Sequence, residues 1–286
     1  MRVLVTGATG FVAGHLVPQL VASGHDVFAA GHDVSRLGRL AGAHPLAWDL
    51  RSPSLPDALP LNLDAIVHLA QVNVPFPAGA GDMFAVHVSC TQRLLELARR
   101  VGVQRFIFTS SGSVYGSSAQ PLKEDDPTRG SGYYAASKVA AERLIQAYGD
   151  LVPHTIFRLF TPYGPGQTNR LVPGLVNRVV NGAPVTVAGG VGPTFNPLYV
   201  THVAGALGKS LGASGNQLLN LGGDQALSVR EMAETIGRIV GREPVIQDQP
   251  GTPDLIVGDL TELRRLYLLP EHLTSFEDGV RAMLSQ

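Results

Sequence analysis

The sequence predicts an α/β fold, a doubly wound parallel sheet with helices on both faces and a smaller C-terminal region. Three observations predict it. Short, apolar, β-branched runs alternate with helical patterns from the first residues onward, which is typical of such a sheet. A Gly-rich turn joins the first strand to the first helix. Hydrophobic residues make up 44% of the 286 residues, so the 33 glycines and 20 prolines indicate many loops and not disorder.

The bulk properties exclude several classes of protein. The net charge is −1, so no basic surface for nucleic acid is predicted. The single cysteine, Cys90, excludes an internal disulfide and a cysteine-based zinc cluster, and no metal site is expected. No apolar run reaches the roughly 20 residues of a membrane span, and residues 2–6 have the pattern of a strand and not of a signal peptide. We therefore expect a cytoplasmic protein without nucleic-acid or membrane partners.

The first strand, residues 2–6, leads through a turn at residues 7–10 into a helix. A buried strand, a tight Gly turn and a helix N-terminus together form a site for an anion such as pyrophosphate. Gly7 permits the turn, Gly10 lets the backbone approach the phosphates, and Ala13 lets the helix pack closely on the strand. The spacing is G-x-x-G-x-x-A, which differs from the common G-x-G-x-x-G. A purely structural turn is the alternative.

The other elements follow in alternation. The sequence predicts further strands over residues 26–30, 46–50, 65–70, 104–109, 155–161 and 218–221, and helices over 11–23, 83–101, 131–144 and 228–240. Residues 65–70 are continuously apolar, as in a strand buried on both faces. Residues 75–81 are expected to be an irregular loop. Ser228 with Glu231 three residues later is a capping box that begins the last of these helices.

Candidate chemistry follows the strand at 104–109. Ser111 and Ser113 come at its C-terminal end, the edge where open α/β sheets bind ligands. Tyr134 and Lys138 are four residues apart at a helix start, so they share one face. A phenol has a pKa of about 10, and a nearby ammonium lowers it. Tyr134 is therefore predicted to be a general acid and base assisted by Lys138, whereas a solvated surface pair would be the interpretation if the two stood alone.

These stretches together resemble the extended short-chain dehydrogenase/reductases, the NAD(P)-dependent sugar-nucleotide epimerases, dehydratases and reductases. The resemblance lies in Thr6-Gly7-Ala8-Thr9-Gly10-Phe11, in the serines and in the Tyr-x-x-Ser-Lys at 134–138. It implies a Rossmann-type fold, with a dinucleotide-binding and catalytic region at 1–166. Residues 167–286 would mainly bind substrate, with some segments returning to the Rossmann core.

The resemblance also implies site residues. Ser111, Tyr134 and Lys138 would be catalytic, with Ser113 in reserve for Ser111. The coenzyme residues that we expect are Gly7, Thr9, Gly10, Phe11, Val12, His32, Arg36, Asp49, Leu50, Leu69, Ala70, Gln71, Thr109, Tyr134, Lys138 and Thr161. For Asp49, capping of the next turn is an equal alternative to a contact with adenine.

Several positions near the coenzyme depart from the family pattern. Gln71 replaces the second Ala of a His-Leu-Ala-Ala run, and Thr161 stands where Asn is usual. His87 replaces the Asn of an Asn-Val-x-Gly-Thr run. In the family that Asn holds the active-site backbone, so the replacement puts the local geometry in question. His68 is interpreted as a packed core histidine without a chemical role.

The end of the second strand indicates the coenzyme. An NAD-specific enzyme places an acid there to bind the ribose hydroxyls. The aligned position holds Gly31, followed by His32, and Arg36 on the next turn could meet a 2′-phosphate. We therefore favour NADP(H), with NAD(H) as the alternative if Asp33 reaches the ribose. Ordinary loop roles for His32 and Arg36 stay open.

The substrate region departs from relatives that act on nucleotide-diphosphate sugars. Those relatives hold the diphosphate with two arginines, the usual bidentate donors for it, but here Phe195 and Gln249 take their places. Arg170 or Arg178 would have to compensate, or the substrate lacks a diphosphate. The substrate residues that we expect are Ser111, Ser113, Asn169, Arg170 and Phe195, with a solvated surface role as the alternative for Arg170.

The expected activity follows from the same residues. Family dehydratases place an acidic pair after the catalytic hydroxyl, and Gly112-Ser113 stands there instead, so a 4,6-dehydratase is not expected. The leading hypothesis is an NADP(H)-using reductase or epimerase of a sugar-like small molecule. Its most concrete form is a reductase of a nucleotide-linked 4-keto-6-deoxy sugar. A ketoreductase of a non-nucleotide metabolite and a dinucleotide-binding module without turnover are the alternatives.

A homodimer is the expected assembly. The family's usual contact is a four-helix bundle of the helices at 83–101 and 131–144. The apolar positions offered for it are Leu94, Leu95, Leu97, Leu144 and Ile145. The alternative is that all five face their own sheet.

Overall fold

A seven-stranded sheet in the order β11-β6-β5-β4-β1-β2-β3 organises the computed structural model, which describes residues 1–72, 74–266 and 268–285. The pairs β1–β2, β1–β4, β2–β3 and β4–β5 are all parallel. The strands are β1 Arg2–Thr6, β2 Asp26–Gly31, β3 His44–Ala47, β4 Ala65–His68, β5 Arg105–Ser111, β6 His154–Leu159 and β11 Gln217–Leu221. From β1 the chain proceeds first toward β2 and β3 and then back to β4, the strand reversal at which such sheets bind ligands. The predicted fold class is confirmed.

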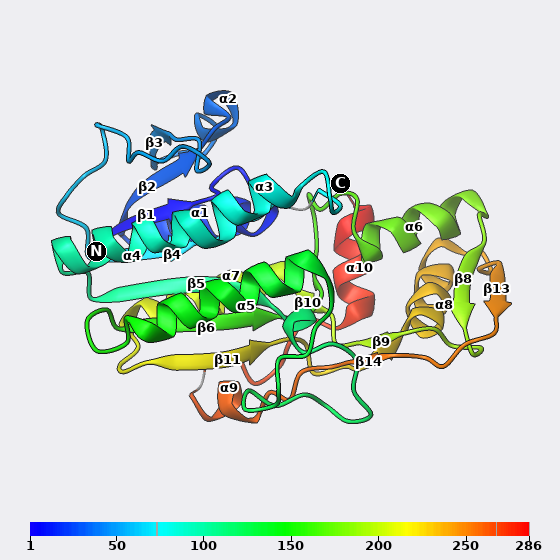
Figure 1. Cartoon of the computed structure of the whole chain (residues 1–286). Helices are drawn as coiled ribbons and strands as arrows, with labels where there is room; N and C mark the ends of the chain where they lie inside the picture. The colour runs from blue at the N-terminus through cyan, green and yellow to red at the C-terminus, as the bar shows by residue number, and fades with distance from the viewer. Residues whose placement is uncertain (73, 267, 286) are drawn as a thin grey trace. The chain divides into compact units, whose positions relative to one another are not determined.

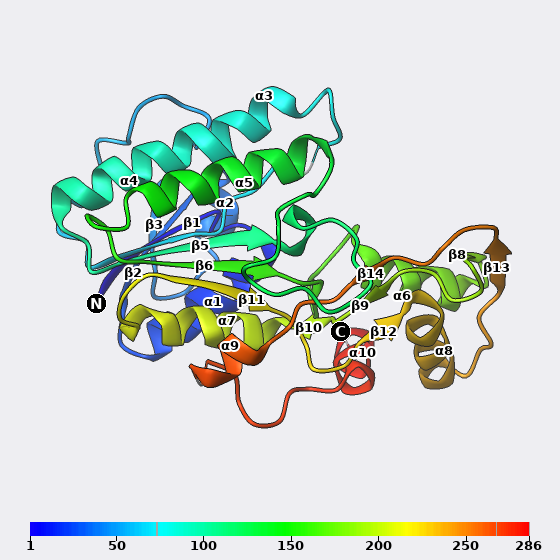
Figure 2. The same cartoon turned by 60° about the horizontal axis from the view of Figure 1, so that its bottom comes forward.

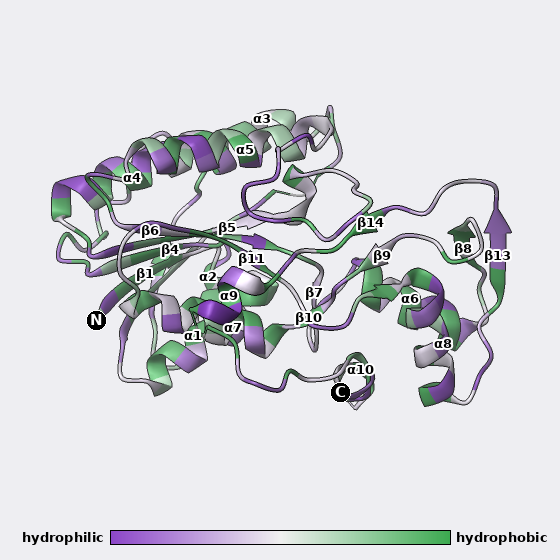
Figure 3. Cartoon of the chain, turned by 90° about the horizontal axis from the view of Figure 1, so that it is seen from below, coloured by the Kyte–Doolittle hydropathy of each residue, from purple (hydrophilic) through white to green (hydrophobic). Residues whose placement is uncertain are grey.

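Helices cover both faces of this sheet (Figures 1 and 2). Two of them, α4 Cys90–Val101 and α5 Gly132–Ala147, lie over one face, and α1 Phe11–Ala22 and α7 Val200–Lys209 lie over the other. Purple and green alternate along α4 and α5 in Figure 3, as expected for helices with one buried face. The short helices α2 Val34–Leu37 and α3 Ala80–Met83 lie in the connections.

The chain divides into two compact units that interleave in sequence. The first is Met1–Val114, Thr128–Arg158 and Ala204–Leu219, and the second is Tyr115–Pro127, Leu159–Val203 and Asn220–Gln286. The second unit holds small sheets in the orders β10-β7, β12-β9-β14 and β13-β8. Its strands are β7 Pro162–Tyr163, β8 Val185–Ala188, β9 Thr194–Phe195, β10 Leu198–Tyr199, β12 Leu227–Ser228, β13 Ile246–Gln249 and β14 Leu255–Ile256, and its helices α6 Leu171–Asn181, α8 Val229–Val240, α9 Thr261–Arg265 and α10 Phe276–Leu284. The functional division predicted at residue 166 stays a prediction.

Local chemistry explains where several elements begin and end. The capping box of α8 is present: Ser228 N donates to Glu231 Oε2 at 2.7 Å, and Glu231 N donates to Ser228 Oγ at 3.2 Å. Gly241 in the left-handed conformation ends the same helix. In β4 every side chain is buried, as its continuous apolar run predicts.

Several predicted boundaries were wrong. The strand predicted at 104–109 ends at Ser111, the strand predicted at 155–161 ends at Leu159, and the helix predicted at 131–144 extends to Ala147. The third strand lies at His44–Ala47 and not at 46–50, because Ala47 pairs with Gly31, the last residue of β2. The fourth ends at His68 and not at 70, because its partner β1 ends at Thr6. The helix predicted at 83–101 begins earlier, at Ala80, within the expected loop, and its segment Phe84–Ser89 is π-helical.

The apolar residues offered for a dimer face lie inside the first unit. Leu94, Leu95, Leu97 and Ile145 are buried in its core, and Leu144 packs against that core. The alternative is therefore correct for four of the five positions, Leu144 is only partly buried, and the homodimer stays a prediction without the support of those four. Within the described ranges, every helix is too short or too polar to cross a lipid bilayer.

Candidate active site

The Gly turn after β1 has the geometry of a phosphate cradle. Gly7 has a φ of +70°, and a Cβ at this position would lie 2.7 Å from Cα and N of Ala70, so only glycine fits. Gly10 N donates to Gly7 O at 2.9 Å, which closes the turn. Gly10 is also the N-cap of α1, and among the described residues no side chain caps that end and no acid lies in its first turn. The free N–H groups and the helix dipole therefore suit a pyrophosphate.

The end of β4 lies against this turn. Leu69 N donates to Thr6 O at 3.2 Å, and Ala70 is the residue in contact with Gly7. The structure thus brings together four of the predicted coenzyme residues, which are Gly7, Gly10, Leu69 and Ala70. Phe11 and Val12 begin α1 directly after the turn.

The end of β2 lacks an acid free to bind a ribose. Gly31 ends the strand, and His32 after it is exposed. Asp33 caps α2, where its carboxylate accepts from Ser35 Oγ at 2.7 Å and from Arg36 N at 3.2 Å. These hydrogen bonds lower the pKa of Asp33, so the group is ionised and engaged within its own turn. Arg36 lies exposed on α2.

Asp49 is likewise held locally. Its carboxylate accepts from Arg51 N at 3.0 Å, Arg51 Nε at 2.9 Å and Arg51 Nη2 at 2.8 Å. Hydrogen bonds from Arg51 lower the pKa of Asp49. The carboxylate therefore does cap the next turn, as the alternative proposed, and its contact with adenine stays a prediction, as does that of the buried Leu50.

The predicted catalytic residues all belong to the first unit, where α5 packs against β5 and the turn Gly112–Val114. Ser111 ends β5, and its Oγ lies 2.9 Å from Ser113 Oγ. Tyr134, in the first turn of α5, donates its hydroxyl hydrogen to Gln71 Oε1 at 3.1 Å. One turn later Lys138 is fully buried.

The surroundings of Lys138 weaken its charge. Its Nζ donates to Thr109 O at 2.9 Å and lies 4.8 Å from the centroid of the Phe108 ring and 6.0 Å from that of Tyr134. Burial lowers the pKa of Lys138 to about 7, and Glu142 opposes that shift. A small change in its surroundings therefore changes whether Lys138 carries a charge at neutral pH.

A buried ion pair behind Lys138 was missed in the sequence. Glu142 Oε2 accepts from Arg158 Nη2 at 2.7 Å, and Glu142 also accepts from Ser110 Oγ. The available signal was Glu142 four residues after Lys138, on the same helix face. Removing one partner would leave a buried charge uncompensated.

His87, which replaces the Asn of the family pattern, is hydrogen-bonded at both ring nitrogens. Its Nε2 accepts from Val72 N at 2.9 Å, and its Nδ1 lies 2.8 Å from Ser137 Oγ. Ser137 Oγ in turn donates to Tyr134 O at 2.8 Å. His68 is a buried core histidine whose Nδ1 lies 2.6 Å from Thr6 Oγ1, in agreement with the role assigned to it.

Thr9 lies in the Gly turn of the first unit, whereas Thr161 and the predicted substrate residues beyond it belong to the second unit. Thr161 precedes β7 with a φ of +44°, and Asn169 is exposed with a φ of +53°. Arg170 is the N-cap residue of α6. Phe195, in β9, packs against the core of this unit and is half-buried, whereas Gln249, in β13, is exposed.

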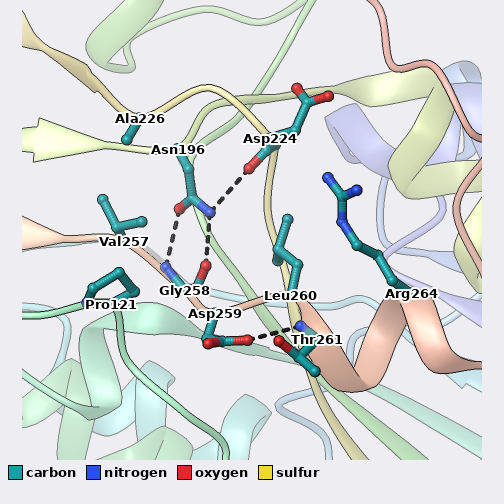
Figure 4. Close-up of a pocket in the computed structure, with 11 residues that line it drawn as sticks. Pro121, Asn196, Asp224, Ala226, Val257, Gly258, Asp259, Leu260, Thr261 and Arg264 are labelled. Carbon is teal, nitrogen blue, oxygen red and sulfur yellow. Dashed lines mark hydrogen bonds between the residues drawn. The ribbon is translucent and has the colours of Figure 1, made fainter.

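The second unit also holds a pocket of about 280 Å³ (Figure 4). Asn196 forms its inner wall: Nδ2 donates to Gly223 O and to Gly258 O at 3.1 Å each, and Oδ1 accepts from Gly258 N at 3.2 Å. Asp259 caps α9 through a bond from Thr261 N at 2.8 Å. None of the predicted site residues lines this pocket. Asn196 is therefore best explained as a structural residue whose side chain links the loops at Gly223 and Gly258 by hydrogen bonds.

Comparisons with known proteins give consistent results. The sequence model of the NAD dependent epimerase/dehydratase family matches residues 3–222. UDP-glucose 4-epimerase of Mycolicibacterium smegmatis is 32% identical over 292 residues, which cover 93% of this chain and 88% of that protein. The solved structure of MoeE5 in complex with UDP-glucuronic acid and NAD is 28% identical, has a TM-score of 0.85 and covers 100% of this chain and 98% of its own. UDP-glucose 4-epimerase of Thermus thermophilus in complex with NAD is 26% identical, with a TM-score of 0.84 and the same coverage.

Proposed function

This chain belongs to the NAD dependent epimerase/dehydratase family, and on that premise we propose that it interconverts hydroxyl and carbonyl groups on the sugar of a nucleotide sugar. The observation that carries the proposal is the pairing of Tyr134 with the buried Lys138 one helical turn later, in the same unit as the Gly7 turn. If the two residues were an ordinary surface pair, the lysine would be exposed to water. Here Lys138 is fully buried, although burial of an ammonium is costly.

The residues present fit a nicotinamide dinucleotide. The Gly7–Gly10 turn and the uncapped N-terminus of α1 would hold the pyrophosphate. Lys138 would hold the nicotinamide ribose. When bound, the dinucleotide supplies a hydride acceptor and donor.

The chain's own residues would handle the proton. Tyr134 would take the proton from the sugar hydroxyl as the carbon is oxidised, and return it when the carbonyl is reduced. Ser111, with Ser113 beside it, would hold the same oxygen by hydrogen bonding. When Lys138 is protonated, its positive charge favours release of the phenolic proton.

We favour epimerisation over net reduction. Two of the similar proteins described above are named UDP-glucose 4-epimerases, and none of the three is named a reductase of 4-keto-6-deoxy sugars. That reductase, our first concrete hypothesis, is therefore the second candidate. A substrate without a diphosphate is the third, because Phe195 packs against the second unit's core at the position where the family pattern has an arginine.

Two assays separate these candidates: substoichiometric NADP or NAD with UDP-glucose or UDP-glucuronic acid, and NADPH or NADH with a keto sugar nucleotide. An epimerase forms the epimer with no net change in reduced coenzyme. A reductase instead consumes one reduced coenzyme per keto sugar. Dinucleotide binding without conversion of any nucleotide sugar, keto sugar or simple ketone would mean a binding module.

Tyr134→Phe tests the assigned chemistry. It removes the hydroxyl that exchanges the proton, together with its hydrogen bond to Gln71, so kcat should fall by about 10²–10⁴-fold while the coenzyme Kd changes little. Tyr133→Phe is the matched control, because it removes a phenol from the same helical turn, where Tyr133 stacks on Phe76 at 5.5 Å. A Tyr134→Phe enzyme with more than about a tenth of wild-type activity would contradict the assignment.

For the coenzyme, we propose a preference for NADP(H). Gly31 removes the acid that repels a 2′-phosphate, and Asp33 is engaged in capping α2. The solved relatives with NAD bound favour the alternative. Arg36→Ala should weaken NADPH binding about ten- to a hundredfold and leave NADH binding unchanged, since a charge-assisted bond contributes about 1.5–3 kcal/mol. Tighter binding of NADH than NADPH by the wild-type protein would contradict the preference.

A further inference from the structure

His87 lies behind Tyr134 in an unusual piece of helix. It is fully buried in the π-helical segment Phe84–Ser89, which packs against α5. Single π turns within α-helices are frequently found at functional sites. The π segment here presents the imidazole to two partners from different parts of the first unit.

The hydrogen bonds of His87 define its tautomer. The amide of Val72 can only donate, so Nε2 must be unprotonated. The proton of the neutral ring is then on Nδ1, which donates to Ser137 Oγ. Ser137 Oγ uses its own hydrogen to bond Tyr134 O. Every donor in this series of hydrogen bonds has one acceptor. In a charged imidazolium, the N–H at Nε2 would face the N–H of Val72, and neither group could accept.

Burial supports the neutral ring. It lowers the pKa of His87 to about 2, and the charge of Lys138 acts in the same direction.

Both branches of this network lead to Tyr134. One branch passes through Ser137 to the Tyr134 carbonyl, within α5. The other branch is the hydrogen bond from Val72 N to His87 Nε2. Val72 follows Gln71, whose Oε1 accepts the hydrogen of the Tyr134 hydroxyl at 3.1 Å. The His87 ring also meets the Tyr134 ring edge to face, with centroids 5.5 Å apart. Two departures from the family pattern, Gln71 and His87, thus act on one phenol.

We propose that His87 is a positioning residue for Tyr134, holding the Gln71–Val72 backbone against α5 through one hydrogen bond at each ring nitrogen. The proposal rests on the proposed function of Tyr134 as acid and base. Asn in this place would reach only the partner of Nδ1, because its side chain is one atom shorter. Gln carries an acceptor at about the position of Nε2 and reaches Val72.

Three variants of His87 test the proposal by separating the two bonds. His87→Phe keeps the volume and removes both, and we expect kcat to fall about 100-fold with coenzyme Kd and KM nearly unchanged, as for a misplaced catalytic group. His87→Gln should recover kcat to within about tenfold of wild type, and His87→Asn should not. Ser137→Ala removes the second branch alone and should give an intermediate loss. A purely structural role would lower the melting temperature without this order in kcat.

Nitrogen-15 NMR of the histidines provides a test that needs no turnover. In the wild-type protein at neutral pH, the His87 ring should carry its proton on Nδ1 and none on Nε2. A proton on Nε2, or His87→Phe with kcat within about threefold of wild type, would overturn the proposal. If Tyr134→Phe is also fully active, the proposed function of Tyr134 fails instead. The NMR measurement of the His87 tautomer still tests whether its two hydrogen bonds are formed as described.

Discussion

Thr161 has a backbone conformation that its side chain disfavours. Its φ is +44°, in the left-handed region where β-branched residues are outliers. The family pattern that this chain resembles has Asn here, and Asn enters this region far more readily. The structure therefore explains on backbone grounds why Asn is usual, which the sequence pattern alone did not.

We expect Thr161→Asn to stabilise the protein by about 1 kcal/mol, because it relieves this strain. Urea unfolding of both proteins measures the difference. Asn169→Thr is the reciprocal control, since it places a β-branched residue at a φ of +53°, and it should destabilise by a similar amount. Equal stability of Thr161→Asn and wild type would show that the strain is absent.

At the scale of elements, the β1–α1 turn requires glycine at position 7 for two reasons, its backbone conformation and the lack of space for a side chain. Gly7 needs a positive φ and leaves no space for a Cβ beside Ala70, whereas Gly14, inside α1, has nothing within 4 Å of such a Cβ. The same substitution should therefore have opposite effects at the two positions.

Gly7→Ala should destabilise the protein by roughly 1–3 kcal/mol and weaken dinucleotide binding, because the turn must shift. Gly14→Ala should stabilise it by about 0.5–1 kcal/mol, as expected inside a helix, with binding unchanged. Thermal unfolding and coenzyme titration measure both effects. If Gly7→Ala binds coenzyme as wild type does, the turn is not the phosphate site.

At the scale of the whole molecule, buried histidines make stability depend on pH. Burial lowers the pKa of His68 to about 3 and that of His87 to about 2, and it also lowers those of His25, His154 and His202. At a pH below 6.5, the ordinary pKa of histidine, these side chains bind protons in the unfolded chain but stay neutral in the folded chain. The free energy of unfolding should therefore fall as the pH falls from 7 toward 3.

Most carboxylates titrate below pH 5. Lys138, whose pKa burial lowers to about 7, adds a slope of the same sign near pH 7, so the lower half of the range from pH 7 to 5 reports the histidines. Each fully buried histidine should contribute a slope approaching about 1.4 kcal/mol per pH unit near pH 5. Denaturant unfolding at several pH values measures the slope. His87→Gln should reduce the slope by the contribution of one buried histidine. A stability that is flat between pH 7 and 5 would contradict the neutral, buried state of these rings.

The homodimer also belongs to this scale. Because Leu94, Leu95 and Leu97 fill the core, a partner would have to contact other side chains of these helices, such as Phe84, which is 53% exposed. Sedimentation at micromolar concentration should show a dimer mass that Phe84→Glu reduces to the monomer. A monomeric wild-type protein would remove the prediction.

The sequence by itself determined the fold class, the Gly turn, the capping box of α8 and the Tyr134/Lys138 pair. These features depend on residues a few positions apart, through side-chain periodicity, turn chemistry and helix spacing, so local sequence is sufficient to predict them. The family assignment followed from the same short motifs.

Only the tertiary structure decided the partners of these residues and the ends of some elements. The strand β3 ends where β2 ends, and the burial of Leu94 depends on a sheet built from distant segments. His87 and Ser137 are 50 residues apart in the chain, and their hydrogen bond exists only because the π segment packs on α5. Such contacts depend on how elements pack, and no local pattern specifies that packing.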